Sequence, residues 1–121
     1  WGALINLGDL ADIRGAPEQA LPLYERAFET MQRVYAREPQ RIRPWQAEVG
    51  VLIAARHEAA GRTAEAERWY RRVLAQSPMH SPSVDGLAAL LIARGDVTAA
   101  RVLCAEHAAR AGPSPGCRTL L

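Results

Sequence analysis

Three glycines with the same neighbours, Gly15, Gly61 and Gly95, constrain the fold of this chain more than any other feature. An alanine follows each glycine by five residues. A branched aliphatic residue precedes each by eight, and is itself followed by glycine or alanine. The glycines are 46 and then 34 residues apart. A pattern that recurs at such intervals is typical of a repeat architecture, in which each unit buries its apolar face against the next.

The segments on either side of each glycine have the periodicity of amphipathic helices. In the first segment the apolar residues are three and four apart: Leu4, Leu7, Leu10 and Ala11. Gly15 is a helix stop, and Pro17 suits the first turn of a second helix. Strand-like alternation is not sustained anywhere in the sequence. We therefore predict an all-α fold of three antiparallel helix hairpins, over about residues 1–40, 44–78 and 81–111.

The recurring residues resemble the tetratricopeptide repeat (TPR) family, whose 34-residue unit reads W-x2-L-G-x2-Y, then A-x3-F, then P. The matching positions are Leu4, Leu7, Gly8, Ala20 and Tyr24 in the first repeat, Ile53, Ala54, Ala66, Tyr70 and Pro78 in the second, and Val84, Leu87, Ala88 and Ala100 in the third. The departures are Ala11, His57 and Leu91, where the family favours tyrosine, and Cys104, which replaces an aromatic residue. The resemblance covers residues 1–111 and implies a right-handed helical solenoid.

The first repeat is longer than the family's usual unit, because its glycine spacing exceeds the next by 12 residues. The run from Gln19 to Phe28 is similar to kinesin-light-chain-like repeats, which use longer units. The apolar stripe continues past Phe28 without a break, so we predict that the extra residues lengthen the second helix and its loop. We also predict that Trp45 covers this extension through a contact with Tyr35 or Met31.

Small residues recur where the two helices of each hairpin should meet. On the first helices they are Gly8, Ala54 and Ala88, and on the second helices Ala20, Ala66 and Ala100. Two helices can approach closely only where side chains are small, and larger neighbours then fill the gaps. We predict that these six positions meet in the core of the hairpins.

The sequence shows no catalytic or metal-binding pattern. It has no glycine-rich phosphate loop, paired-cysteine zinc spacing or nucleophile elbow. Cys104 and His107 are three residues apart on one predicted helix, but two ligands do not make a metal site. His57 falls at a packing position, and His80 lies in a predicted loop without an obvious partner. We therefore expect no enzyme activity, cofactor or metal.

Composition also argues against nucleic-acid and membrane binding. All 15 basic residues are arginine, yet the net charge is only +2, which is too small to steer nucleic acid. Three arginines, Arg68, Arg71 and Arg72, do flank Trp69 and Tyr70, but both rings align with the packing positions of the other repeats. No apolar run approaches the roughly 20 residues that span a bilayer. Two cysteines are too few for a disulfide scaffold, so we expect a reducing, cytoplasmic setting.

In TPR proteins the first helix of each hairpin lines a concave groove where extended or helical peptides bind. Carried over by register, the resemblance implies a groove lined by Asn6, Asp9 and Asp12, by Glu48, Leu52, Ala55 and Glu58, and by Asp85 and Ile92. Some family members clamp a partner's C-terminal carboxylate with lysine, arginine and asparagine. Here only Asn6 matches, because Leu52 and Gly86 hold the later positions, so we do not expect that clamp.

Four carboxylates, Asp9, Asp12, Glu48 and Glu58, distinguish this predicted groove. They lie in the first two repeats beside an apolar strip. Such a surface should prefer a protein or peptide partner that is basic or amphipathic. A plainly solvated acidic face is the alternative interpretation.

The last ten residues, 112–121, are turn-rich and too short for a capping helix. We predict that they form a tail or the start of a further repeat, and we assign no role to Cys117 within them. The function we expect is a non-enzymatic protein-interaction module that is part of a larger protein. The alternative is a structural segment that forms homo-oligomers through its apolar end faces.

Overall fold

The computed structural model describes residues 2–35, 44–112 and 114–118. In these ranges the chain forms six α-helices and one short 3-10 helix, η1, and no strand. Their bounds are α1 Gly2–Ile13, α2 Pro17–Tyr35, α3 Pro44–Ala59, α4 Thr63–Gln76, α5 Ser81–Ala93, α6 Val97–Ala111 and η1 Pro115–Cys117. No helix among the described residues combines the length and the apolar character needed to cross a membrane.

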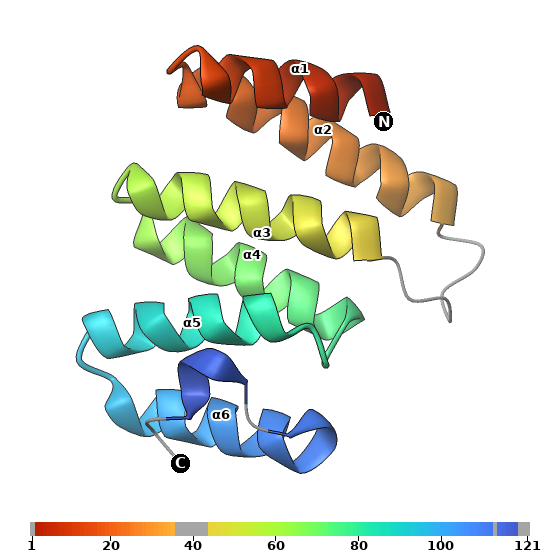
Figure 1. Ribbon diagram of the computed structural model, residues 1–121. Coiled ribbons are helices and arrows are strands. Elements are labelled where there is room, and N and C mark those ends of the chain that lie inside the picture. Colours follow the sequence, from red (N-terminus) through yellow and green to blue (C-terminus); the bar gives the residue numbers. More distant parts are fainter. Residues whose placement is uncertain (1, 36–43, 113, 119–121) are drawn as a thin grey trace.

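The helices form three hairpins stacked in chain order. The hairpins are α1–α2, α3–α4 and α5–α6, and the second helix of each packs against the first helix of the next (Figure 1). Helices α3 and α5 also touch directly. The predicted all-α, TPR-like solenoid of three antiparallel hairpins is confirmed.

The three repeated glycines close the hairpins with the same backbone geometry. Their φ angles are +76°, +80° and +88° at Gly15, Gly61 and Gly95, a left-handed conformation that glycine adopts without a steric penalty. In each hairpin the N–H of the following residue bonds to the carbonyl five residues earlier: Ala16 to Ala11, Arg62 to His57 and Asp96 to Leu91. This bond is the mark of a Schellman helix end, which satisfies carbonyls that would otherwise lack a partner.

The small residues of the repeat lie where the helices approach most closely. The six predicted positions are all buried: Gly8, Ala54 and Ala88 with Ala20, Ala66 and Ala100. A Cβ atom added to Gly8 would lie 2.6 Å from Cε1 of Tyr24, so the tyrosine ring fills the space that glycine leaves. A Cβ on Gly86 would lie equally close to the ring of Tyr70, this time across the α4–α5 interface.

The longer first repeat places part of its extra length in α2. This helix has 19 residues, whereas α4 has 14 and α6 has 15. Met31, in the extension, is fully buried. The side chain of Trp45, for which we predicted a contact with Tyr35 or Met31, lies outside the described part of the structure. The predicted loop, residues 36–43, lies outside it as well.

The outer face of α1 differs from the prediction. Leu7 and Leu10 were expected in the core, but 52% of Leu7 and 42% of Leu10 is exposed. The residues at the register position of Leu7 in the other hairpins, Ile53 and Leu87, are fully buried. The reason is the stacking order: α2 covers α3 and α4 covers α5, whereas α1 is the first helix of the described stack.

One further expectation is overturned at the other end of the stack. Cys104 and Cys117 form a disulfide, so Cys117 is a structural residue rather than an incidental one. This bond joins η1 to α6, and η1 packs against α5. The disulfide also removes the basis for expecting a reducing, cytoplasmic setting, because disulfides persist mainly in oxidising compartments.

Candidate partner-binding surface

The residues predicted to line a groove come from the first helices of the three hairpins. Five are exposed: Asn6, Asp9, Glu48, Glu58 and Ile92. The other four are half-buried: Asp12, Leu52, Ala55 and Asp85. Side-chain bridges described below connect α1 to α3 and α3 to the start of α5, so the three helices share this face. We call it the groove face.

A four-residue polar network lies at the α1 end of the groove face. The hydroxyl of Tyr24 lies 2.7 Å from Oδ1 of Asp9 and 2.9 Å from Oδ2 of Asp12. Arg56 of α3 donates from Nε and Nη2 to the carboxylate of Asp12, with a shortest distance of 2.6 Å. A planar guanidinium that meets both oxygens of a carboxylate fixes orientation as well as charge. The network therefore ties the first hairpin to the second.

The hydrogen bonds and burial within this network shift the pKa values of Asp12 and Tyr24 in opposite directions. The Arg56 guanidinium is the main cause that lowers the pKa of Asp12 below its usual value. Burial raises the pKa of the Tyr24 phenol, and the hydrogen bonds to Asp9 and Asp12 raise it further. Asp12 therefore stays ionised and Tyr24 stays protonated across the neutral pH range.

The second hairpin repeats the tyrosine–carboxylate pair of the first. Tyr70 occupies the register position of Tyr24, and its hydroxyl lies 3.2 Å from Oε2 of Glu58. In both hairpins this tyrosine follows its carboxylate, Asp12 or Glu58, by 12 residues. Burial, with the nearby Glu58 charge, raises the pKa of Tyr70 to about 12. In the third hairpin the same two positions hold Ile92 and Cys104, so the pair is absent there.

His80 links α3 to the start of α5, although the sequence suggested no partner for it. Its Nε2 atom lies 3.0 Å from Oε1 of Glu48, and its Nδ1 atom lies 2.7 Å from the hydroxyl of Ser83. A carboxylate can only accept, so Nε2 carries the hydrogen in this arrangement. All four carboxylates of the predicted groove thus have partners within the protein, and Arg56 neutralises one of them.

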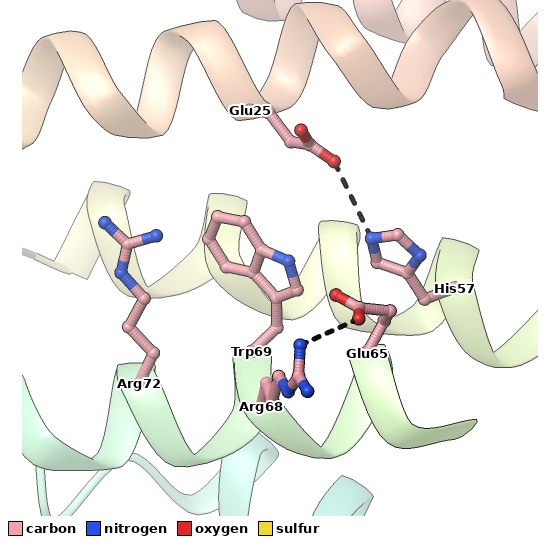
Figure 2. A pocket seen from close by; sticks show the side chains of 6 residues that line it. All are labelled: Glu25, His57, Glu65, Arg68, Trp69 and Arg72. Atoms are coloured by element: carbon pink, nitrogen blue, oxygen red, sulfur yellow. Dashed lines mark hydrogen bonds and ion pairs between the residues drawn. The ribbon is translucent and has the colours of Figure 1, made fainter. Parts of the chain in front are cut away.

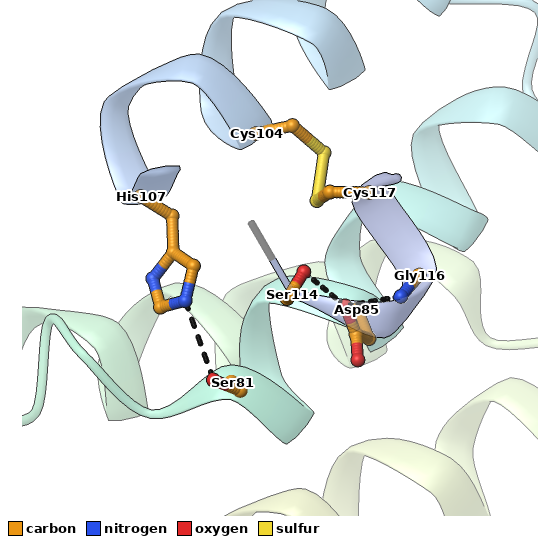
Figure 3. Close-up of a disulfide and its surroundings, with 7 residues drawn as sticks. All are labelled: Ser81, Asp85, Cys104, His107, Ser114, Gly116 and Cys117. Carbon is orange, nitrogen blue, oxygen red and sulfur yellow. Dashed lines mark hydrogen bonds between the residues drawn. A yellow bond between two sulfur atoms is a disulfide. The ribbon is translucent and has the colours of Figure 1, made fainter. Parts of the chain in front are cut away.

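The tail covers the α5 end of the groove face (Figure 3). The hydroxyl of Ser114 donates to Oδ1 of Asp85 at 2.5 Å, and the backbone N–H of Gly116 donates to the same atom at 3.1 Å. Ser114 and Cys117 are buried. Asp85 is therefore occupied by the protein's own chain, and the acidic part of the groove face comes from the first two hairpins.

A pocket of about 410 Å³ is lined by residues of α2 and α4 and by His57 of α3 (Figure 2). It is lined by Glu25, His57, Glu65, Arg68, Trp69 and Arg72. The half-buried ring of Trp69 meets Phe28 edge-on at 5.0 Å between centroids. The guanidinium of Arg72 lies 4.6 Å from the centre of the Phe28 ring and 4.9 Å from that of Trp69. This cluster joins the first two hairpins on their outer side.

The arginines around Trp69 are engaged in ion pairs with glutamates. Arg68 pairs with Glu65 at 3.0 Å, Arg71 with Glu67 at 3.5 Å and Arg72 with Glu29 at 2.9 Å. Tyr70 is buried.

His57 is buried, as its packing position predicted. Its Nδ1 atom accepts from Nε of Arg62 at 2.9 Å, and its Nε2 atom lies 3.6 Å from Glu25. In the part of the chain that the structure describes, no three histidine, cysteine, aspartate or glutamate side chains come together as a metal site would require.

Comparison with known families agrees with the repeat pattern. A family model described as "Tetratricopeptide repeat" matches residues 2–40, which include the first hairpin. This match supports a TPR repeat family, whose members are in general non-enzymatic repeats that mediate protein–protein interaction. No curated protein matches the sequence.

Proposed function

We propose that this chain is a protein-interaction module that binds a basic or amphipathic peptide segment of a partner on the groove face. The observation that carries the proposal is the set of exposed carboxylates Asp9, Glu48 and Glu58, each held by an internal donor. The module comprises residues 1–111, with a first repeat of the longer, kinesin-light-chain-like kind. It has no catalytic role.

The internal donors prepare these carboxylates for a partner. Tyr24, His80 and Tyr70 each engage one oxygen and so restrict the side chain that carries it. Within the described ranges no donor meets the other oxygen of these three groups. Side chains that are already ordered lose less entropy on binding, which strengthens the interaction with a cationic group of the partner.

An apolar strip completes the proposed surface. It consists of half-buried Leu52 and Ala55 on α3 and of Ile92, 41% exposed, on α5. An amphipathic helix places apolar residues at i, i+3, i+4 and i+7, which suits such a strip, and its basic face can meet the carboxylates beside it. The charge pattern would steer association and select the partner more than it would raise affinity.

The test uses a defined probe, a leucine and lysine peptide with the amphipathic helical pattern, and its leucine and glutamate counterpart as the control ligand. The test variant combines Asp9→Asn, Glu48→Gln and Glu58→Gln. Each amide keeps an oxygen that accepts the bond from Tyr24, His80 or Tyr70. The matched control removes the same charge elsewhere, with Glu18→Gln, Glu65→Gln and Glu106→Gln.

We expect the lysine peptide to bind and the glutamate peptide not to bind. Three exposed ion pairs at about 0.5 kcal/mol each predict that the test variant binds the lysine peptide about tenfold more weakly. The control variant should retain the affinity of the unmodified protein. Equal affinity in all three proteins would refute binding at the groove face. Self-association without peptide binding would instead favour the oligomerisation alternative.

A further inference from the structure

The disulfide between Cys104 and Cys117 has a consequence for the groove face. We propose that it is a redox-sensitive latch, which keeps residues 114–118 over the α5 end of that face until a dithiol reductant opens it. The inference rests on the proposed function, because it concerns access to the same surface. The part that becomes accessible is the carboxylate of Asp85 and the face of α5 around it.

The contacts of the tail are centred on one acceptor. Ser114 and Gly116 both donate to Oδ1 of Asp85, and η1 packs on α5. A Cβ atom on Gly116 would lie 2.7 Å from that oxygen, so the backbone approaches as closely as it does only because the residue is glycine. The tail is thus fitted to Asp85, the residue that the repeat register assigns to the groove.

The third hairpin lacks the tyrosine–carboxylate bond of the other two, and the disulfide takes its place. Tyr24 and Tyr70 anchor their hairpins by hydrogen bonds to Asp12 and Glu58. At the equivalent position Cys104 is covered instead by Cys117, and both are fully buried. A 3-10 helix of three residues does not persist by itself. Without the covalent bond, the tail would be held only by the Asp85 contacts and by the packing of η1 on α5.

The chemistry of opening is ordinary thiol–disulfide exchange. One thiolate of the dithiol attacks a sulfur of the Cys104–Cys117 bond, forms a mixed disulfide and releases the other cysteine as a thiol. The second thiol of the reductant then attacks the reductant's own sulfur in the mixed disulfide, releases the second cysteine as a thiol and closes a cyclic disulfide. Two electrons and two protons pass from the dithiol to the two cysteines. Since both are buried, the reductant reaches the bond only when Ser114 and Gly116 move away from Asp85, and the Asp85 contacts resist this movement.

The first measurement needs no partner. Hydrogen exchange of residues 114–118 and carbodiimide labelling of Asp85 are compared before and after treatment with dithiothreitol. We expect reduction to speed exchange and labelling by about tenfold or more, as for a segment that loses its protection. The variant Cys104→Ser/Cys117→Ser should behave as the reduced protein and ignore the reductant. Asp85→Ala should be reduced faster than the unmodified chain.

A second variant tests the proposal without removing the cysteines, in case the cysteine mutant does not fold. In Gly116→Ala the added methyl group would displace the tail from Asp85 while the disulfide stays intact. We expect slower labelling of Asp85 than in the reduced protein but faster labelling than in the oxidised one. Circular dichroism checks that the helices persist in every form.

The second measurement is the affinity of the leucine and lysine peptide for the oxidised and the reduced protein. We expect about threefold tighter binding after reduction, because one carboxylate and the α5 surface become accessible. If carbodiimide labels Asp85 no faster after reduction than before, the proposed latch is wrong. Equal affinity in both forms would also overturn it, although that result leaves the groove function intact. If the peptide binds neither form, the proposed function fails, and Asp85 labelling still decides whether reduction uncovers α5.

Discussion

At the scale of single residues, Tyr24 is the side chain on which the first hairpin depends most. Its ring fills the space beside Gly8, and its single O–H lies within hydrogen-bond distance of two carboxylates on the groove face. One residue thus supports both the packing of α1 on α2 and the arrangement of the proposed binding surface.

Replacing Tyr24 by phenylalanine keeps the ring and removes only the hydroxyl. We expect the free energy of unfolding to fall by about 1–2 kcal/mol, the value of hydrogen bonds to charged acceptors. Urea denaturation measures the change. Tyr70→Phe loses a single hydrogen bond to Glu58, so it should lower the free energy of unfolding by less. A Tyr24→Phe variant as stable as the unmodified chain would contradict this role of the hydroxyl.

The ion pair between Arg56 and Asp12 predicts a pH dependence. The pKa of Asp12 is lower in the folded chain than its unfolded value near 3.9, so the pair stabilises the fold fully above about pH 5. Its contribution is lost as the pH falls through the lowered folded value. The pair is partly exposed, and solvent screening keeps its contribution modest.

Arg56→Met tests this dependence. At pH 7 we expect the variant to be less stable by about 1 kcal/mol. The difference from the unmodified chain should begin to shrink below about pH 4, where Asp12 is protonated in the unfolded chain, and should vanish once the pH falls below the lowered pKa of Asp12 in the folded chain. Arg101→Met, at an exposed position on α6, serves as control. A difference that stays constant from pH 7 to pH 2 would contradict the assignment to Asp12.

The register of the repeat predicted the acidic residues of the first helices, but not their partners. Hydrogen bonds such as that of His80 to Glu48 depend on how neighbouring hairpins are offset, which periodicity alone does not encode. One signal was present: in two repeats an acidic residue precedes the tyrosine by 12 positions, as Asp12 precedes Tyr24 and Glu58 precedes Tyr70. Two occurrences of that spacing in one chain point to a tyrosine–carboxylate bond within each of the first two hairpins.

At the scale of elements, the small residues decide how closely the helices pack. Ala66 is fully buried, whereas Ala64, on the same helix, is exposed. We expect Ala66→Leu to overpack the α3–α4 interface and to destabilise the fold by roughly 1–3 kcal/mol. Ala64→Leu should leave stability nearly unchanged. Thermal and urea unfolding would both reveal the contrast, and equal effects of the two substitutions would show that the hairpin register is wrong.

Helices were predictable because their apolar stripes and glycine stops are local signals. The tail was not, since residues 112–118 have no periodicity, and their position depends on two long-range contacts, Ser114 with Asp85 and Cys117 with Cys104. Cysteine count alone suggested that the thiols would be free. Pairing was decided instead by the path of the chain after Gly112, which turns back with a φ of +80°.

At the scale of the whole molecule, stability should follow the stacking order of the hairpins. Leu87 is covered by the preceding hairpin, and Leu7, at the same register position, is half-exposed. We expect Leu87→Ala to cost about 2–5 kcal/mol and Leu7→Ala less than about 1 kcal/mol. Chemical denaturation of both variants measures the difference. Similar losses would mean that the α1 face is covered in solution.

The most direct test of the central claim is amide chemical-shift mapping of the chain with the leucine and lysine peptide. The account predicts that the shifted resonances cluster on α1 and α3, around Asp9, Leu52 and Glu58, and that reduction extends them to Asp85 on α5. Shifts concentrated instead on α2 and α4, around Trp69 and the outer pocket, would contradict binding at the groove face.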